Sequence, residues 1–430
     1  MDAAPDEARE LRIDGGRLWA SLMEMARIGA TAKGGVCRLA LTDLDRASRD
    51  LFLGWCRDAG CTVKVDAMGN LFARRAGRDD TLAPVGTGSH LDSQPTGGRF
   101  DGVYGVLAGL EVIRTLNDRG METERPIEIS VWTNEEGSRF APAMVGSGVY
   151  AGVFTLDYGH SRAAADGTTI GDELKRIGYL GSEPMGDRPV HAFFETHIEQ
   201  GPILEHEGQT IGVVTHAQGQ RWYELVLTGQ ESHAGPTPMA VRRDALLGAA
   251  KVVQLVNAIG LAHAPLAVST VGMLEVFPGS RNVIPGRTFL TIDFRCPDDA
   301  ELLEMDAELK AGVARIATDG ALEHDLEQIF QYDCVQFDES CVDAVRSGAK
   351  RLGYRTREIV SGAGHDACYL SKVTPTAMIF VPCIGGISHN EIEDAKPEWI
   401  EAGGNVLLQA VLAKSNERVA ASRPARLQAA

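Results

Sequence analysis

Several features that point to particular classes of protein are missing from this 430-residue sequence. The chain has a formal net charge of −17 and no basic patch or tail, which argues against nucleic-acid binding. No apolar run reaches the roughly 20 residues that cross a bilayer, so no membrane span is expected. The segment 1–10 is acidic and polar, unlike a signal peptide, and we therefore expect a cytoplasmic protein.

Motifs of several enzyme classes are also missing. The eight cysteines include no CxxC pair, which favours buried thiols over disulfides or a cysteine zinc site. There is no GxSxG elbow and no HExxH motif, the signatures of common serine hydrolases and zinc proteases. The GTG at residues 86–88 lacks a third glycine and a Walker lysine, so we interpret it as a tight turn.

The amino-terminal half has the pattern of alternating strands and helices. A helix is expected to begin after Thr42, a good N-cap. Apolar runs at residues 85–90, 127–135 and 192–197 read as strands, and residues 105–120 read as a helix. Such alternation predicts an α/β fold, with a mainly parallel sheet flanked by helices.

The pattern changes near residue 217. Residues 220–229 alternate like a half-solvated strand, and residues 266–277 and 287–296 are two further strand-like runs. A long helix is expected to begin at Pro238 with Thr237 as its cap, and another to span residues 298–318. This order predicts a separate, smaller α+β domain.

The alternation of strands and helices seen in the amino-terminal half returns after about residue 332, which divides the chain into three parts. We expect a catalytic domain made of residues 1–216 and 332–430, with the smaller domain, residues 217–331, inserted between them.

Side chains that metals favour follow several of the apolar runs. They are His90, Asp101, Glu135, Glu136, His197 and His389. Because ligands bind beyond the carboxyl ends of parallel strands, these side chains are expected to share one site. Imidazole and carboxylate ligands without thiolates suit zinc, manganese, cobalt or nickel. Five of them, His90, Asp101, Glu136, His197 and His389, are more ligands than one tetrahedral zinc needs, and two metals sharing the Asp101 carboxylate would fit.

The adjacent glutamates are expected to divide the work. Adjacent residues point in different directions, so one of the pair can bind metal while the other faces a water molecule as general base. The alternative is that both are solvated charges at a strand end. Asp92 is expected to hydrogen-bond the His90 ring and fix its tautomer.

Seven segments in order along the chain carry a resemblance to a known family. They are GSHLDSQPTGGRFDGVYGV, TNEEGSRF, ETHIEQG, SHAGPTPM, RNVIPG, DFRCPD and SGAGHDA. Jointly they resemble the N-carbamoyl-amino-acid amidohydrolases, a group with L-carbamoylases, β-ureidopropionases and, more distantly, allantoate amidohydrolases. The group lies in the dinuclear-metal aminoacylase and carboxypeptidase superfamily.

The resemblance implies a role for each candidate residue. It assigns the metal ligands to His90, Asp101, Glu136, His197 and His389, and the general base to Glu135. It implies two divalent ions, with zinc expected first, and a homodimer formed through the inserted lid domain. His233 would stabilise the oxyanion from the neighbouring subunit. Asn282 and Arg295 would hold a substrate carboxylate, Gln200 would contact the carbamoyl group, and His365 would line the pocket.

The activity that the resemblance implies is hydrolysis of a small ureido substrate. N-carbamoyl-L-amino acids or N-carbamoyl-β-alanine would yield the amino acid, carbon dioxide and ammonia. These two substrates differ by one methylene, which the sequence does not resolve. Allantoate hydrolysis is the nearest alternative, an aminoacylase or dipeptidase is a more distant one, and a non-catalytic protein on the same fold is the last.

Overall fold

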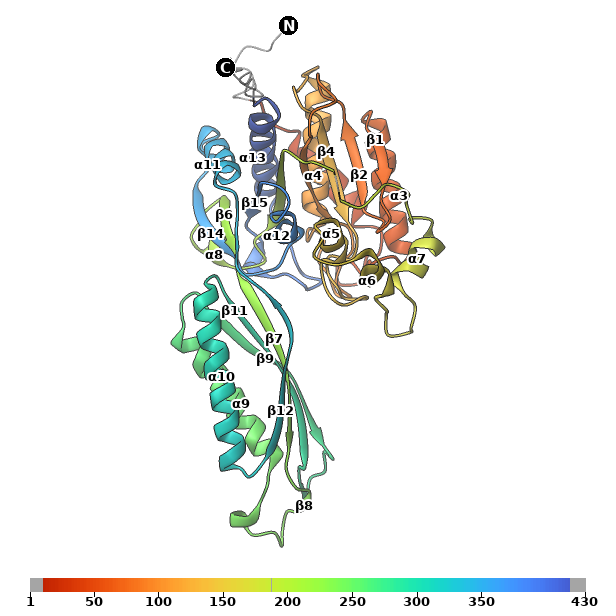
Figure 1. Ribbon diagram of the computed structural model, residues 1–430. Helices are drawn as coiled ribbons and strands as arrows, with labels where there is room; N and C mark the ends of the chain where they lie inside the picture. The colour runs from red at the N-terminus through yellow and green to blue at the C-terminus, as the bar shows by residue number, and fades with distance from the viewer. Residues whose placement is uncertain (1–10, 187, 418–430) are drawn as a thin grey trace, which may run out of the picture. The chain divides into compact units, whose positions relative to one another are not determined.

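The computed structural model shown in Figure 1 describes residues 11–186 and 188–417. The segment 1–10, on which the expected location partly rests, lies outside the described residues. The chain forms two compact units. The first unit comprises the described residues of 1–215, 337–359 and 365–430, and the second comprises 216–336 and 360–364.

Eight strands of a nine-stranded sheet lie wholly or mostly in the first unit, and the ninth, β13, belongs to the second. The order of the sheet is β1-β2-β4-β3-β5-β15-β6-β13, with β14 paired to β6. The strands are β1 (Thr62–Val65), β2 (Leu71–Arg75), β3 (Val85–His90), β4 (Ile127–Trp132), β5 (Ala192–Ile198), β6 (Ile211–Ala217), β13 (Val335–Gln336), β14 (Thr356–Ser361) and β15 (Thr376–Val381). The central strands β4, β3, β5 and β15 are parallel and buried along their whole length. The predicted α/β class with a mainly parallel central sheet is therefore confirmed.

Helices accompany this sheet. They are α2 (Gly15–Met25), α3 (Asp43–Asp58), α4 (Val103–Asp118), α5 (Val145–Tyr150), α6 (Leu156–Ser161), α7 (Ile170–Ile177), α8 (Ile203–His206), α11 (Glu339–Arg351), α12 (Asp366–Leu370) and α13 (Pro397–Ser415), with a 3-10 turn at Ile384–Gly386. The predicted cap of α3 is confirmed, since the Thr42 hydroxyl accepts a hydrogen bond from the Asp45 N–H. Helices α4 and α13 are buried along most of their length and complete the core.

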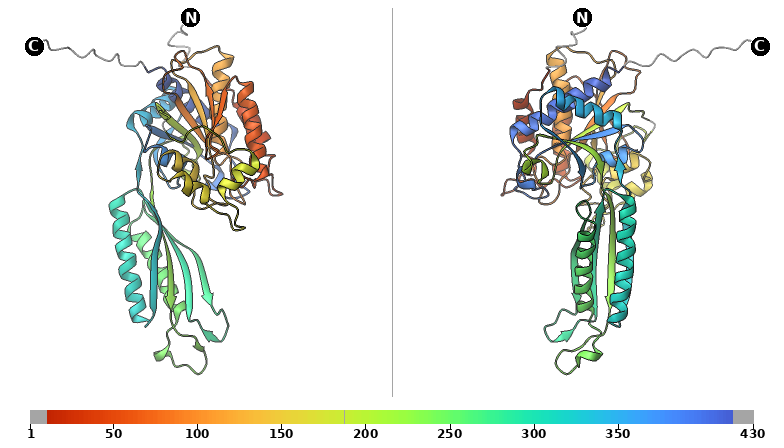
Figure 2. Two further views of the ribbon diagram at one scale, coloured as in Figure 1. Left: turned by 45° about the vertical axis from the view of Figure 1, so that its right-hand side comes forward. Right: turned by 90° about the vertical axis from the view of Figure 1, so that its left-hand side faces the viewer.

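The second unit is a four-stranded antiparallel sheet in the order β12-β7-β11-β9, with α9 and α10 packed on one face (Figure 2). Its elements are β7 (Gly219–Thr228), β8 (Ser232–His233), a 3-10 turn (Met239–Val241), α9 (Ala245–Ala262), β9 (Val268–Phe277), β10 (Val283–Ile284), β11 (Arg287–Cys296), α10 (Asp299–Asp319) and β12 (Glu323–Tyr332). Alternate residues of β7 and β11, such as Leu225 and Ile292, form the core with the two helices.

The predicted helix start at Pro238 is wrong. Helix α9 begins at Ala245, and the Asp244 carboxylate caps it by accepting the Leu247 N–H. The Arg242 guanidinium donates hydrogen bonds to the main-chain carbonyls of Ala234 and Thr237, which holds the preceding segment as a loop. Hydrogen bonds from a side chain five to eight residues further along the chain thus prevail over the N-cap signal of Thr237.

Helix α9 differs from the expectation that no apolar segment is long enough to cross a bilayer. It is long and apolar enough to cross a membrane, judged by length and composition alone. Its residues Ala249, Val252 and Val256 pack in the core of the second unit, as expected of a core helix.

Candidate metal centre and active site

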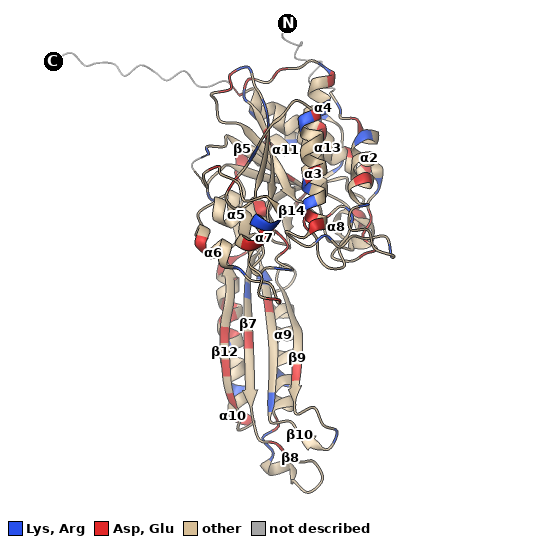
Figure 3. Cartoon of the chain, turned by 90° about the vertical axis from the view of Figure 1, so that its right-hand side faces the viewer, with Lys and Arg blue, Asp and Glu red and all other residues tan. Residues whose placement is uncertain are grey.

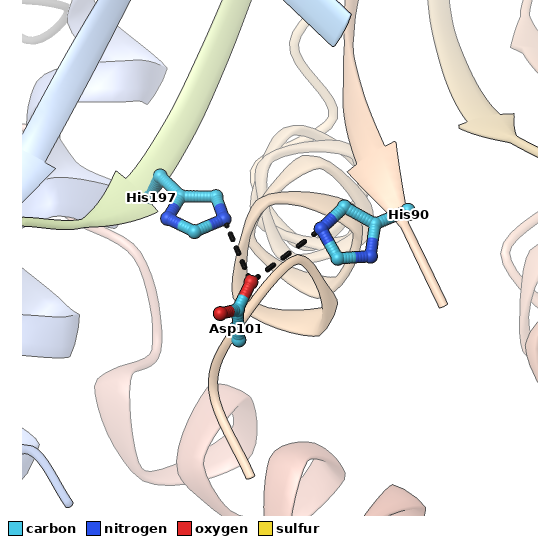
Figure 4. A group of neighbouring side chains, drawn as sticks. All are labelled: His90, Asp101 and His197. Carbon is cyan, nitrogen blue, oxygen red and sulfur yellow. Dashed lines mark ion pairs between the residues drawn. The ribbon is translucent and has the colours of Figure 1, made fainter. Parts of the chain in front are cut away.

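The carboxyl ends of β3 and β5 bring two histidines to the start of α4. Figure 4 shows His90 and His197 on either side of Asp101. Asp101 Oδ1 lies 3.5 Å from His90 Nε2 and 3.2 Å from His197 Nε2. All three side chains are buried. Potential ligand atoms of these three residues lie within 4.8 Å of one another, so one cation can reach them all.

The other oxygen of Asp101 belongs to a second group. His389 Nε2 lies 3.5 Å from Asp101 Oδ2 and 3.5 Å from Glu136 Oε2. Ligand atoms of these three residues also lie within 4.8 Å of one another. The five predicted ligands therefore form two clusters that share the Asp101 carboxylate. This donor set fits a pair of divalent cations with one bridging carboxylate.

Hydrogen bonds on the far side of each ring orient the two buried histidines. His90 Nδ1 lies 2.9 Å from the main-chain carbonyl of Asp92, and His197 Nδ1 lies 2.9 Å from that of Ile198. These contacts place the ring protons on Nδ1. Both Nε2 atoms therefore lie on the side of Asp101 as acceptors, and His197 Nε2 accepts the Gly102 N–H at 3.1 Å.

The Asp92 carboxylate does not have the contact that the sequence predicted. Its Oδ1 lies 4.0 Å from His90 Nδ1, and the main-chain carbonyl of the same residue takes that place. The carboxylate instead accepts the main-chain N–H groups of Glu135, at 3.3 Å, and Glu136, at 3.2 Å. Asp92 therefore supports His90 and the two glutamates at once.

Glycine is required where α4 begins beside the first histidine. Gly102 has φ +66°, and a Cβ there would lie 2.3 Å from His90 Cε1. Any side chain would displace the ring and carry the neighbouring Asp101 away from it.

The sequence analysis missed a residue that holds Glu136. The Gln94 main-chain N–H donates to Glu136 Oε1 at 3.1 Å, and Gln94 Nε2 donates to Glu136 Oε2 at 2.7 Å. The Ser138 hydroxyl donates to Gln94 Oε1 at 2.6 Å, which fixes the amide. No sequence signal marks Gln94 apart from its place in the loop after His90.

Glu135 lies beside the first cluster. Its Oε2 is 3.5 Å from His90 Nε2, and burial raises the pKa of its carboxyl group well above the usual range. The negative charges of Asp366 and Glu136 act in the same direction. A buried carboxylate with a raised pKa is a stronger base than an exposed one, which suits proton transfer.

Two further predicted residues lie at this site. Gln200 Nε2 donates to Asp101 Oδ2 at 2.8 Å, while its buried Oε1 has no hydrogen-bond partner. His365 is buried, with its ring centroid 4.6 Å from that of His197. Burial lowers the pKa of His365 well below its usual value, and the charge of His197 adds to this.

Backbone strain is concentrated around the site. Asn134, which precedes Glu135, and the residues Gln200 and His389 all have positive φ, between 53° and 59°. Such a conformation costs about 1–3 kcal/mol for each non-glycine residue and persists where the surroundings impose it. The fold thus stabilises an unfavourable backbone in order to place these side chains.

The remaining predicted residues belong to the second unit. His233 and Asn282 are exposed neighbours, since β8 pairs with β10 and the Ala234 N–H donates to the Asn282 carbonyl at 2.9 Å. Arg295 lies near the opposite end of β11, with its guanidinium bound to Asp293.

The length of β11 separates these residues. Arg287 begins β11 and Arg295 is eight residues further along, which is roughly 27 Å in a strand. The Asn282 and Arg295 side chains of one chain therefore cannot hold the same small carboxylate.

Comparison with known proteins identifies the family. The family model described as Peptidase family M20/M25/M40 matches residues 86–413. An N-carbamoyl-L-amino-acid amidohydrolase of Rhizobium meliloti is 52% identical over 95% of this chain and 98% of its own length. A ureidoglycolate hydrolase of Oryza sativa subsp. japonica is 33% identical over 93% of this chain and 84% of its own.

A solved structure agrees. The crystal structure of an amidase of the hydantoinase/carbamoylase family from Burkholderia multivorans has a TM-score of 0.91 at 70% identity, covering 95% of this chain and 100% of that one. The resemblance inferred from the motifs is confirmed. The chain therefore belongs to peptidase family M20/M25/M40, as a hydrolase of amide C–N bonds.

Proposed function

We propose that the protein hydrolyses N-carbamoyl-L-amino acids or N-carbamoyl-β-alanine to the amino acid, carbon dioxide and ammonia. The observation that carries this proposal is the pair of clusters sharing Asp101, with Glu135 alongside. The 52% identity to an N-carbamoyl-L-amino-acid amidohydrolase supports the choice of substrate.

Each cluster would hold one divalent cation. His90, His197 and Asp101 form one site, and His389, Glu136 and Asp101 the other. We propose zinc first, with manganese, cobalt and nickel as alternatives, because all suit nitrogen and oxygen ligands. Bound cations would polarise the ureido carbonyl and lower the pKa of the attacking water.

The side chains of the first unit would perform the proton transfers. Glu135 takes a proton from water and returns it to the leaving nitrogen, consistent with its raised pKa. Gln200 Oε1, buried and without a partner, can accept a hydrogen bond from the carbamoyl NH₂ group. His365 lines the site beside His197.

Residues of the second unit would hold the rest of the substrate. Arginine suits a carboxylate because its planar fork can donate paired hydrogen bonds, which is the role proposed for Arg295. His233 would stabilise the oxyanion, and Asn282 would assist in binding. Since His233 and Asn282 lie far from Arg295 in one chain, a complete site needs two chains. We therefore propose a homodimer.

The two edges of the second unit's sheet support one particular dimer surface. Strand β12 carries the exposed acidic residues Glu323, Asp325 and Glu327. Figure 3 shows acidic positions along this strand, and such charges discourage pairing with another strand. Strand β9 instead exposes apolar side chains, including Val268 and Met273. Exposed apolar residues on an unpaired edge mark a contact surface. Strand β9 and the neighbouring α9 are the proposed interface.

Mixing two inactive variants tests the shared site. His233→Ala and Arg295→Ala chains, each inactive alone, should regain about a quarter of the parent activity after subunit exchange, since half of the dimers then hold one intact site. No recovery, with exchange verified by mass spectrometry, would contradict a site built from two chains.

A panel of substrates tests the reaction. We expect release of ammonia from N-carbamoyl-L-methionine or N-carbamoyl-β-alanine, with added zinc or manganese, to exceed that from allantoate and from a dipeptide. A preference for allantoate would favour the nearest alternative activity. Absence of bound metal together with no hydrolysis would favour a non-catalytic protein. We also propose a cytoplasmic location, to be checked by cell fractionation.

A further inference from the structure

A buried glutamate outside the predicted ligand set clasps the loop that carries Asp101. Glu393 follows His389 by four residues and is 1% exposed. Its Oε1 accepts the main-chain N–H groups of Phe100, at 2.9 Å, and Asp101, at 3.2 Å. Its Oε2 accepts the Ser388 hydroxyl at 2.9 Å. Within residues 11–186 and 188–417, no ion pair joins Glu393 to a lysine or arginine.

The loop is shaped around this carboxylate. A Cβ at Gly98 would lie 1.9 Å from Glu393 Cδ, so only glycine allows the backbone to pass there. Burying a carboxylate without a cationic partner is costly unless hydrogen bonds satisfy it. Three donors do so here, two of them on the segment of the bridging ligand.

The Ser388 hydroxyl lies within hydrogen-bond distance of both the Asp101 and the Glu393 carboxylates, but it can donate to only one of them. Its oxygen lies 3.0 Å from Asp101 Oδ2 and 2.9 Å from Glu393 Oε2. A hydroxyl has one proton to donate. If that proton goes to Asp101, it competes with a cation for Oδ2. Gln200 Nε2 already donates to Asp101 Oδ2 at 2.8 Å, which uses one of the two lone pairs of that oxygen. If the Ser388 proton goes to Glu393, the second lone pair of Oδ2 remains open for a cation.

We propose that Glu393 is a positioning residue for the second cation. It anchors the Asp101 loop through two N–H groups and accepts the Ser388 proton, which leaves Asp101 Oδ2, already bonded to Gln200, one lone pair for the cation shared with Glu136 and His389. The inference rests on the dinuclear centre proposed above. It explains why position 393 needs a side chain with two hydrogen-bond acceptor oxygens, although Glu393 is not itself a metal ligand.

The substitution Glu393→Gln separates these two tasks. The amide oxygen must face the N–H groups of Phe100 and Asp101, so the NH₂ group faces Ser388. Ser388 then accepts from the amide, and its proton turns to Asp101 Oδ2. We expect one Co²⁺ to bind as in the parent and the second about 10-fold or more weakly, the range found for groups that orient metal ligands. Isothermal titration and the visible absorption of bound Co²⁺ measure this.

A double variant tests the role of the proton. Adding Ser388→Ala to Glu393→Gln removes the competing proton, and the second Co²⁺ should bind more tightly than in Glu393→Gln alone. A merely structural loss would not be rescued in this way. Glu391→Gln is the matched control, since Glu391 lies in the same loop and pairs with Lys33 at 3.3 Å. It should bind two ions as the parent does.

The outcomes distinguish this inference from the proposed function. A parent protein that binds fewer than two ions contradicts the dinuclear centre itself. A parent that binds two ions, with Glu393→Gln binding both equally well, overturns only the role of Glu393. If Glu393→Gln does not fold, a crystal structure of the Co²⁺-loaded parent decides. Ser388 within hydrogen-bond distance of Glu393 Oε2 supports the inference, and Ser388 or Glu393 bound to an ion overturns it.

Discussion

The two units hold their candidate residues in different ways. In the first unit, His90, Asp101 and His197 are buried, and groups outside the ligand set fix their orientation. In the second unit, His233 on the short strand β8 and Asn282 in the turn before β10 are exposed. A buried, hydrogen-bonded site is organised before its ligand arrives, whereas exposed side chains lose freedom on binding. The candidate metal centre is thus a property of one unit's fold, whereas the substrate contacts proposed above would depend on assembly.

The largest effect is expected from the base of the first unit. Glu135→Gln keeps the size of the side chain but removes its proton-accepting oxygen, so kcat should fall about 100- to 10,000-fold. Cation binding should change little, because Glu135 belongs to neither cluster. Kinetics with metal analysis check both. Full activity in this variant would exclude Glu135 as the base.

Removing the cations should affect the two units unequally. A chelator should lower the protection of the first unit against hydrogen exchange near residues 90–102 and 384–393. At cation concentrations 100 times the Kd, the linked stabilisation is about 2.7 kcal/mol, or roughly 100-fold in exchange. The core of the second unit, around Leu225 and Ile292, should keep its protection. Equal losses in both units would contradict a centre confined to one.

A smaller loss is expected from the support beneath the glutamates. Asp92→Asn retains one acceptor oxygen for the N–H groups of Glu135 and Glu136 and replaces the other with a donor. Groups that orient metal ligands typically contribute 10- to 100-fold to affinity or activity. We expect a metal affinity lowered within that range, measured by titration. An unchanged affinity would mean that the main-chain contacts of this segment are sufficient.

The smallest effect is expected in the second unit. Arg295→Lys keeps the charge but loses the planar fork, and KM should rise about 10-fold with kcat less affected. Arg315→Lys, an exposed position on α10, is the control and should leave both constants unchanged. A fall in kcat alone would mean that Arg295 acts on the transition state rather than on binding.

The sequence pointed to those candidate site residues that lie at the carboxyl ends of strands. His90, Glu136 and His197 follow or end apolar runs, and parallel pairing brings such ends to one edge of the sheet. The groups that orient them could not be inferred, because their contacts join segments far apart. Gln94 reaches Glu136, and Glu393 reaches the loop of Asp101. Residue types alone do not encode such contacts.

The errors have similar causes. Asp92 was correctly chosen as a neighbour of His90, but its main-chain carbonyl, and not its carboxylate, contacts the His90 ring. The carboxylate accepts the Glu135 N–H instead. The helix expected at Pro238 starts later because Arg242 holds the preceding loop. The family resemblance implied one carboxylate for Asn282 and Arg295 to hold, and only the direction of β11 shows that the two residues lie far apart within one chain.

The length of β11 has a kinetic consequence. If each complete site needs residues from opposite ends of β11 in two different chains, a single chain carries parts of two sites and no complete site. Dilution to protein concentrations at which the dimer dissociates would then abolish activity without unfolding the protein. In that regime turnover per volume would scale with the square of the protein concentration.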